Sequence, residues 1–113
     1  MVVQDADTAI AFRSGDVPVL ATPRLLALVE EATVKAVEGT VPPGHTTVGM
    51  RVQLDHLIPV PVGVTVRAEA TLERVEGRRL SFTVSVNNER GLVAAGKLTR
   101  VLVNRERFLE KAQ

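Results

Sequence analysis

Residues 22–39 read TPRLLALVEEATVKAVEG and predict the only long helix of the chain, over residues 23–38. Thr22 is the expected N-cap, and Pro23 suits the first helical turn, where a backbone amide hydrogen has no partner to lose. Gly39 is a typical helix stop. At about 100° per residue the helix has one apolar stripe. Its members are Leu25, Leu26, Val29, Ala32, Thr33 and Ala36.

The period of the apolar residues changes to two after the helix, beginning at Thr46, which predicts a β-strand. Pro59 and Pro61 end this strand. Strict alternation puts one set of side chains on the inner face, namely Val48, Met50, Val52, Leu54, His56 and Ile58. It puts the other set on the outer face, namely Thr47, Gly49, Arg51, Gln53 and Asp55.

Three more alternating stretches follow, at about 64–75, 80–86 and 92–103, and they are joined by short turns. Such hairpins predict a mostly antiparallel sheet. Residues 1–21 predict a short strand, a loop and an extended approach to the helix, and residues 105–113 predict a polar helix or tail. One sheet with one apolar face and one helix with one apolar stripe bury each other best when the sheet wraps around the helix. The predicted fold class is therefore α+β.

The composition narrows the function. The chain has 113 residues, which fits one domain over residues 1–113. Its net charge is +1 and its three aromatic residues are all Phe, so neither nucleic acid nor a membrane surface is an expected partner. There is no cysteine, which excludes thiol catalysis and agrees with a reducing, cytoplasmic location. No apolar run approaches the roughly 18 residues of a membrane span, and the N-terminus does not resemble a signal peptide.

Neither a metal nor another cofactor is expected. The two histidines and the scattered carboxylates lack the spacing of metal ligands. No glycine-rich nucleotide loop is present. The chemistry would then depend on side chains alone.

Three residues are candidates for chemistry, and each also has an ordinary structural explanation. His56 continues the inner face of its strand, and taken alone it is more often a core-rim histidine than a proton carrier. Glu30 lies at the margin of the helix stripe, where a partly desolvated carboxylate is a better acid or base, although such residues are usually solvated. Thr22 caps the helix, whose free amides and dipole could also stabilise an oxyanion.

The stretch Val19–Pro23, the helix through Glu30, and the strand from Val48 to His56 together resemble the fluoroacetyl-CoA thioesterase-like branch of the hot-dog superfamily. That family places a catalytic Thr at the helix start, a Glu eight residues later and a His thirty-four residues after the Thr. The matching residues in this sequence, by both spacings, are Thr22, Glu30 and His56.

The resemblance covers about Val17 to Val103 and implies a hot-dog fold, a homodimer with sites at the subunit interface, and carbonyl recognition near Gly49. Joining two sheets edge to edge would also hide an otherwise unpaired strand. Fluoroacetyl specialists carry aromatic residues in the lid before the helix, whereas Arg13–Pro18 offers none. The resemblance therefore predicts thioester hydrolysis rather than fluoroacetyl specificity.

The leading hypothesis is a cytoplasmic acyl-CoA thioesterase that hydrolyses a short or medium acyl-CoA to the free acid and CoA. A non-catalytic acyl-CoA-binding module and a hot-dog dehydratase are the alternatives. Glu30 is expected to act as nucleophile or as general base, Thr22 to orient it or the substrate or to attack directly, and His56 to pair with this group and transfer protons. The acyl length, the carrier, and the choice between dimer and tetramer stay open.

Overall fold

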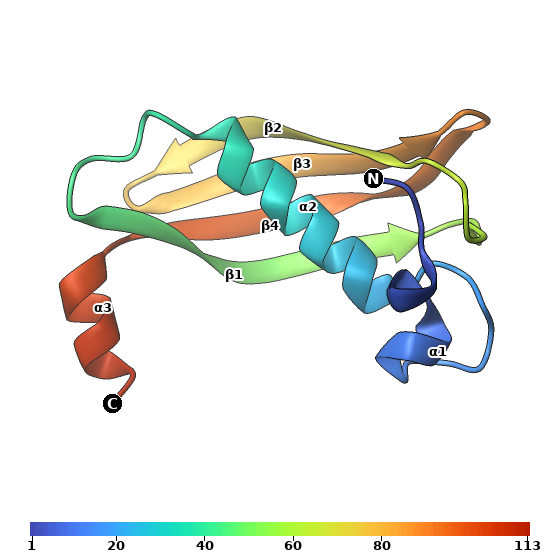
Figure 1. Ribbon diagram of the computed structural model, residues 1–113. Helices are drawn as coiled ribbons and strands as arrows, with labels where there is room; N and C mark the ends of the chain where they lie inside the picture. The colour runs from blue at the N-terminus through green and yellow to red at the C-terminus, as the bar shows by residue number, and fades with distance from the viewer.

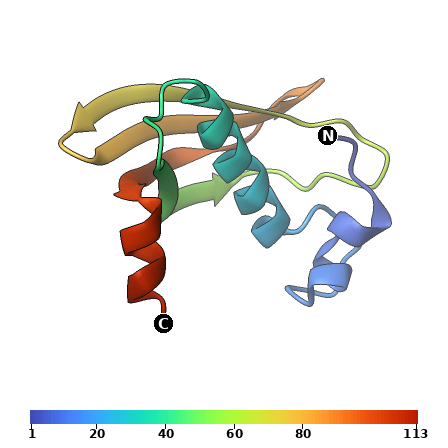
Figure 2. The same cartoon turned by 60° about the vertical axis from the view of Figure 1, so that its left-hand side comes forward.

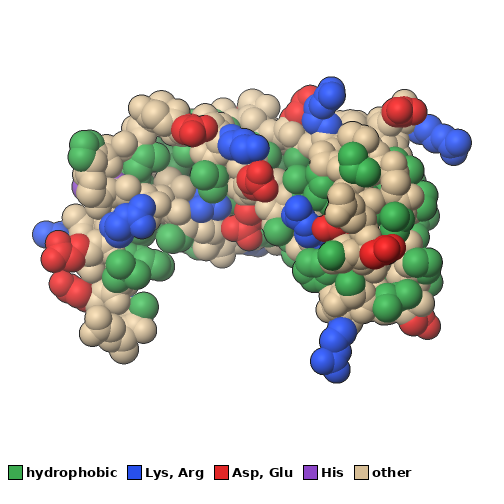
Figure 3. All heavy atoms as spheres, viewed as in Figure 1, with side chains coloured by type: hydrophobic (Ala, Val, Ile, Leu, Met, Phe, Trp, Pro, Cys, Tyr) green, Lys and Arg blue, Asp and Glu red, His purple; other side chains and the backbone are tan.

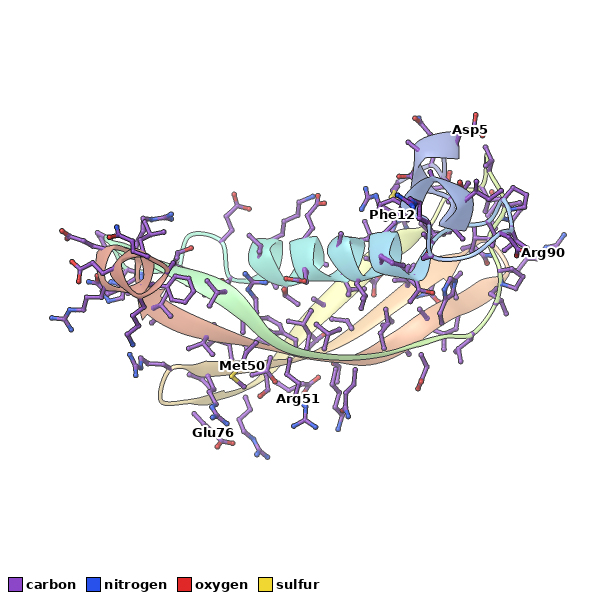
Figure 4. The ribbon with its side chains drawn as sticks, turned by 90° about the horizontal axis from the view of Figure 1, so that it is seen from below. Asp5, Phe12, Met50, Arg51, Glu76 and Arg90 are labelled. Atoms are coloured by element: carbon purple, nitrogen blue, oxygen red, sulfur yellow. The ribbon has the colours of Figure 1, made fainter.

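The computed structural model describes all residues from 1 to 113 and contains one sheet with a long helix, α2, lying across it (Figure 1). The sheet has four strands in the order β1-β4-β3-β2, and neighbouring strands are antiparallel. In side view the sheet curves around α2 (Figure 4), so the predicted α+β arrangement is confirmed. The elements are α2 (Thr22–Ala36), β1 (His45–His56), β2 (Arg67–Glu76), β3 (Arg79–Asn88) and β4 (Gly91–Asn104).

The hydrophobic core lies between α2 and the inner face of the sheet. Burial of each large apolar side chain here contributes roughly 1.5–3 kcal/mol. On the helix the buried line is narrower than predicted, because Leu25, Val29 and Thr33 are buried whereas Ala36 is exposed. The core cluster comprises Val3, Leu20, Leu25, Val29, Val37, Val60, Val66, Phe82, Val84, Val86, Val93, Ala94 and Leu98.

The start of α2 differs from the prediction in a way that matters for the site. Ala21, not Thr22, is the N-cap, and its carbonyl accepts the first helical bond from the Leu25 amide at 3.0 Å. Thr22 is the first helical residue, and its hydroxyl bonds to no backbone amide of the first turn. The Thr22 hydroxyl is therefore free for another partner. The helix also ends at Ala36, two residues before the predicted end.

A β-bulge in β1 overturns the predicted assignment of side chains to its two faces. Gly49 pairs with Arg100, and Arg51 pairs with the adjacent Thr99 of β4. Met50 between them has no partner and is an extra residue in β1. An extra residue reverses the side on which all earlier side chains point. Val48, predicted on the face of His56, therefore points to the opposite side. Thr47 and Gly49, predicted outside, instead face the helix.

The N-terminal segment is helical where a strand was predicted. Residues Asp5–Asp7 form a 3-10 turn, and Ala9–Phe12 form the short helix α1. The Thr8 hydroxyl accepts a hydrogen bond from the Ala11 amide and so caps α1, a local bond that competes with extended structure. The extended approach to α2 is confirmed, since the Leu20 amide donates to the Val60 carbonyl at 2.8 Å.

A C-terminal helix, α3 (Arg105–Lys111), follows β4 directly, in the region for which a polar helix or a tail was predicted. The Asn104 side chain caps it by accepting from the Arg107 amide at 3.0 Å. Two views of the ribbon show α3 and the N-terminal segment projecting beyond β1 at opposite ends of that strand (Figures 1 and 2). None of the helices combines the length and the apolar character that a membrane crossing requires.

Candidate active site

Thr22 and His56 meet at the junction between the start of α2 and the end of β1. The Thr22 Oγ1 atom lies 2.9 Å from His56 Nδ1, within hydrogen-bond distance. The bulge lies before His56, so His56 keeps its predicted inward side and pairs with the buried Ala94 of β4. The geometry therefore brings together two of the three predicted residues, which are 34 positions apart in the sequence.

The environment of His56 favours a neutral imidazole. Burial lowers the pKa of His56 below its usual value of 6.5, and a contact with the Ile58 backbone partly offsets this effect. The Nε2 atom is buried and has no hydrogen-bond partner. A neutral ring has one nitrogen that accepts a proton and one that donates. His56 can therefore exchange a proton with the Thr22 hydroxyl near neutral pH.

A pocket of about 320 Å³ opens beside this pair. That volume is at the small end of the range for ligand sites in proteins. Six of its eleven lining residues are hydrophobic, and Ser14, Thr22 and His56 supply polar side chains. The apolar side chains around it include Val17, Val19, Leu20, Leu57 and Ile58. The pocket thus places apolar side chains next to the Thr22–His56 pair.

Glu30 belongs to a second cluster, eight residues after Thr22 on α2. Its Oε2 atom lies 3.4 Å from Nη1 of Arg100, which is 7% exposed, while the Glu30 side chain is 44% exposed. Arg100 is held by Thr47, since its Nε donates to Thr47 Oγ1 at 2.9 Å and its Nη2 donates to the Thr47 carbonyl at 2.8 Å. A Cβ atom at Gly49 would lie 2.7 Å from Glu30 Oε2. Gly49 therefore leaves room for the carboxylate, and Arg100 orients it.

Arg100 is a candidate site residue that the sequence analysis did not identify. It occupies the inward register of β4, in line with the buried Leu98 and Ala94. An arginine on the apolar face of a strand is uncommon unless its charge is paired. The alternation Ala94, Gly96, Leu98, Arg100 is visible in the sequence and could have identified it. Thr47 had no such signal, because only the bulge turns it inward.

The two clusters do not touch within one chain. Thr22 and Glu30 are eight residues apart, which separates them by about 12 Å along the helix axis at 1.5 Å per residue. Glu30 makes no hydrogen bond to Thr22 or His56. The predicted direct pairing of His56 with Glu30 is therefore absent from the single chain. Both clusters do lie along β1, and its outer edge has no partner strand.

Glu31 behaves as predicted for a residue on the solvent side of α2. Its side chain is 55% exposed and forms an exposed ion pair with Lys35 at 3.2 Å, one helical turn away. Such a pair contributes at most a few tenths of a kcal/mol. Glu31 is therefore a matched control for Glu30.

Comparisons with known proteins agree with the geometry. The model of a family described as fluoroacetyl-CoA-specific thioesterase matches residues 3–106. The fluoroacetyl-CoA thioesterase of Streptantibioticus cattleyicolor is 34% identical over 95 residues, which are 84% of this chain and 68% of that protein.

Solved structures show the same fold. The fluoroacetyl-CoA thioesterase FlK superposes with a TM-score of 0.92 at 30% identity, covering 99% of this chain and 87% of that one. A hot-dog-like protein from Thermanaerovibrio acidaminovorans superposes with a TM-score of 0.91 at 26% identity, covering 99% and 83%. These similarities confirm the predicted hot-dog fold.

Proposed function

The chain belongs to the family of fluoroacetyl-CoA-specific thioesterases, and from this premise we propose how its residues divide the work of hydrolysis. It is an acyl-CoA thioesterase, which cleaves an acyl-CoA to the free acid and CoA. The observation that supports this location of the site is the hydrogen bond between Thr22 and His56 beside a small pocket. The size of that pocket supports a short or medium acyl group.

The thioester carbonyl lies at the N-terminus of α2. The first turn of a helix offers amides without partners inside the helix, together with the positive end of its dipole. These groups stabilise the negative charge that develops on the carbonyl oxygen. Thr22 directs its hydroxyl at the reacting group, and His56 relays the proton to the departing CoA sulfur.

Glu30 acts in the site of the partner subunit. In its own chain it is about 12 Å from Thr22 along the helix axis, too far for direct proton transfer. Its carboxylate lies over Gly49 of β1, one of the two edge strands of the sheet, and for this reason we place the second copy at the β1 edge rather than at the β2 edge. A homodimer paired through β1 would therefore bring each Glu30 close to the other subunit. There its carboxylate serves as the nucleophile or as the base that activates water.

A thiol-release assay across a panel of acyl-CoA esters tests the assignment. Glu30→Gln and His56→Ala should each lose roughly 10²-fold or more in kcat/KM. Glu31→Gln should keep the wild-type rate, because its carboxylate is exposed on the solvent side of α2. Wild-type rates for both Glu30→Gln and His56→Ala would contradict the proposal.

Mixing two inactive variants tests the shared site. When Glu30→Gln and His56→Ala chains form mixed dimers, one site in each mixed dimer regains both groups if Glu30 acts across the interface. Random mixing should then restore about a quarter of the wild-type activity. If mixed dimers are shown to be present and no activity is recovered, Glu30 does not act in the site of the partner subunit.

Sedimentation should show a homodimer at micromolar concentration, or a tetramer built from such dimers. A stable monomer would contradict the shared site. The cytoplasmic location stays a prediction from the sequence.

A further inference from the structure

Exposed apolar side chains lie on both projections that flank β1. On α3, Phe108 is 40% and Leu109 is 56% exposed, and no residue of this helix is buried. A seven-residue helix is unstable alone in water, so α3 needs a surface to pack on. On the N-terminal projection Phe12 and Val17 are 42% and 49% exposed, and Ile58, in the loop that follows β1, is 37% exposed.

The space-filling view shows a hollow between the two projections, with apolar atoms of α3 turned toward it (Figure 3). The unpaired edge of β1 borders this hollow (Figure 1). The α3 helix is tied to the beginning of β1, since the Arg105 amide donates to the Gly44 carbonyl at 3.0 Å. The Thr22–His56 pocket lies at the opposite end of β1.

A two-fold axis through the edge of β1 exchanges the two ends of the strand. An antiparallel pair of β1 strands brings the beginning of one beside the end of the other. The α3 of each subunit then lies beside the Thr22–His56 pocket of the other subunit. We propose that Phe108 and Leu109 of the partner subunit cover this pocket and form the outer wall of the acyl site, an inference that rests on the thioesterase dimer proposed above.

Charge and composition support a second copy as the occupant. Residues 105–111 carry three basic and two acidic side chains. Residues 5–16 carry Asp5, Asp7, Asp16 and Arg13, and Asp7 is already paired with Arg24, so Asp5 and Asp16 outnumber Arg13. The two projections are therefore opposite in net charge and attract each other across the two-fold axis. The pocket's own lining contains no Phe, Tyr or Trp. The partner's Phe108 would supply the missing ring and exclude water from the thioester.

Engineered cysteines test the contact directly, because the chain has no cysteine of its own. The double variant Leu109→Cys with Ile58→Cys should form a covalent dimer under mild oxidation. A disulfide within one chain is excluded, since the 12 residues of β1 span about 36 Å between the two ends.

The matched control combines Leu109→Cys with Val34→Cys, an exposed apolar position on α2 that is 47% exposed. It should stay monomeric on a non-reducing gel. Equal cross-linking of both pairs would overturn the proposal. So would the absence of a covalent dimer for the Ile58 pair while sedimentation shows that the variant dimerises.

A second measurement asks which subunit's Phe108 serves which site. In a mixed dimer of wild-type chain with His56→Ala/Phe108→Ala chain, the one competent site faces the altered α3, so KM should rise about tenfold with kcat less affected. In a mixed dimer of His56→Ala chain with Phe108→Ala chain, the competent site faces an intact α3 and should have the wild-type KM.

The reverse pattern, or equal KM values in the two mixed dimers, would overturn the proposal while leaving thioesterase activity intact. Failure of the wild-type protein to cleave any acyl-CoA would instead remove the proposed function. The cysteine pair would still decide the contact in that case, so the two failures are distinguishable.

Discussion

Replacing Thr22 with valine separates its two competing roles, helix cap and participant in catalysis. Valine keeps the branched shape and removes only the hydroxyl. Loss of a threonine N-cap typically costs about 1 kcal/mol and up to about 2. Here Ala21 is the cap and the Thr22 hydroxyl bonds to His56 Nδ1 instead. Because Thr22 is exposed, its hydroxyl is replaced by water without a buried polar group being left behind.

We therefore expect the free energy of unfolding of Thr22→Val to stay within about 0.5 kcal/mol of the wild type, as for other exposed substitutions. The activity should fall much further. Removing a group that participates in proton transfer typically costs 10²–10⁴-fold, which corresponds to roughly 3–5 kcal/mol of transition-state stabilisation. The effect on kcat/KM should thus exceed the effect on stability by several kcal/mol.

The measurements are urea unfolding followed by circular dichroism, and thiol release from a short acyl-CoA. Thr22→Ser keeps the hydroxyl and should retain most of the activity. A Thr22→Val protein that loses about 1 kcal/mol of stability yet hydrolyses acyl-CoA at the wild-type rate would refute the reasoning. Thr22 would then be a structural cap and nothing more.

Five further predictions concern the site. Because burial lowers the pKa of His56, the acid limb of the kcat/KM profile should titrate below 6.5, with activity rising with pH and level above it; a limb above 6.5 would contradict this. Because the pKa of His56 is lower in the folded chain than in the unfolded chain, the unfolded chain binds the proton more tightly, and the free energy of unfolding should decrease as the pH falls below 6.5. The His56→Gln variant should lack this contribution to the pH dependence of stability. Gly49→Ala should displace the Glu30 carboxylate and lower kcat/KM by about 10²-fold, with unchanged unfolding. Arg100→Met fills a similar volume but frees Glu30, so kcat/KM should fall about tenfold or more while stability changes by less than about 2 kcal/mol; unchanged kinetics would remove Arg100 from the site. Activity should survive EDTA, and a loss that zinc restores would contradict the metal-free mechanism.

The fold was predictable because two periods in the sequence are strong. The stripe of the long helix and the alternation of the strands each follow directly from how apolar residues meet a core. The N-terminal helix α1 was not predictable in this way, because Ala9–Phe12 is too short for a helical period to be distinguished from a strand. A local bond from the Ala11 amide to the Thr8 hydroxyl decides it.

The faces of β1 before the bulge were mispredicted for a specific reason. Val48 and Met50 continue the apolar alternation of Val52 and Leu54, so the sequence contains no break in the pattern. The partner strand determines the bulge, since Gly49 and Arg51 pair with adjacent residues of β4. Pairing of this kind depends on both strands together and is invisible in either one alone.

The bulge also explains why one inward-facing charge is tolerated in the core. Without it Thr47 would point away from α2, and the guanidinium of Arg100 would lose both hydrogen bonds that Thr47 makes. A buried guanidinium without partners would cost several kcal/mol. With the bulge, Thr47 holds Arg100, Arg100 orients Glu30, and Gly49 leaves the space that the carboxylate occupies. The extra residue in β1 is thus a requirement of the carboxylate cluster, and deleting Met50 should disrupt that cluster while leaving the Thr22–His56 hydrogen bond on the other side of the bulge in place.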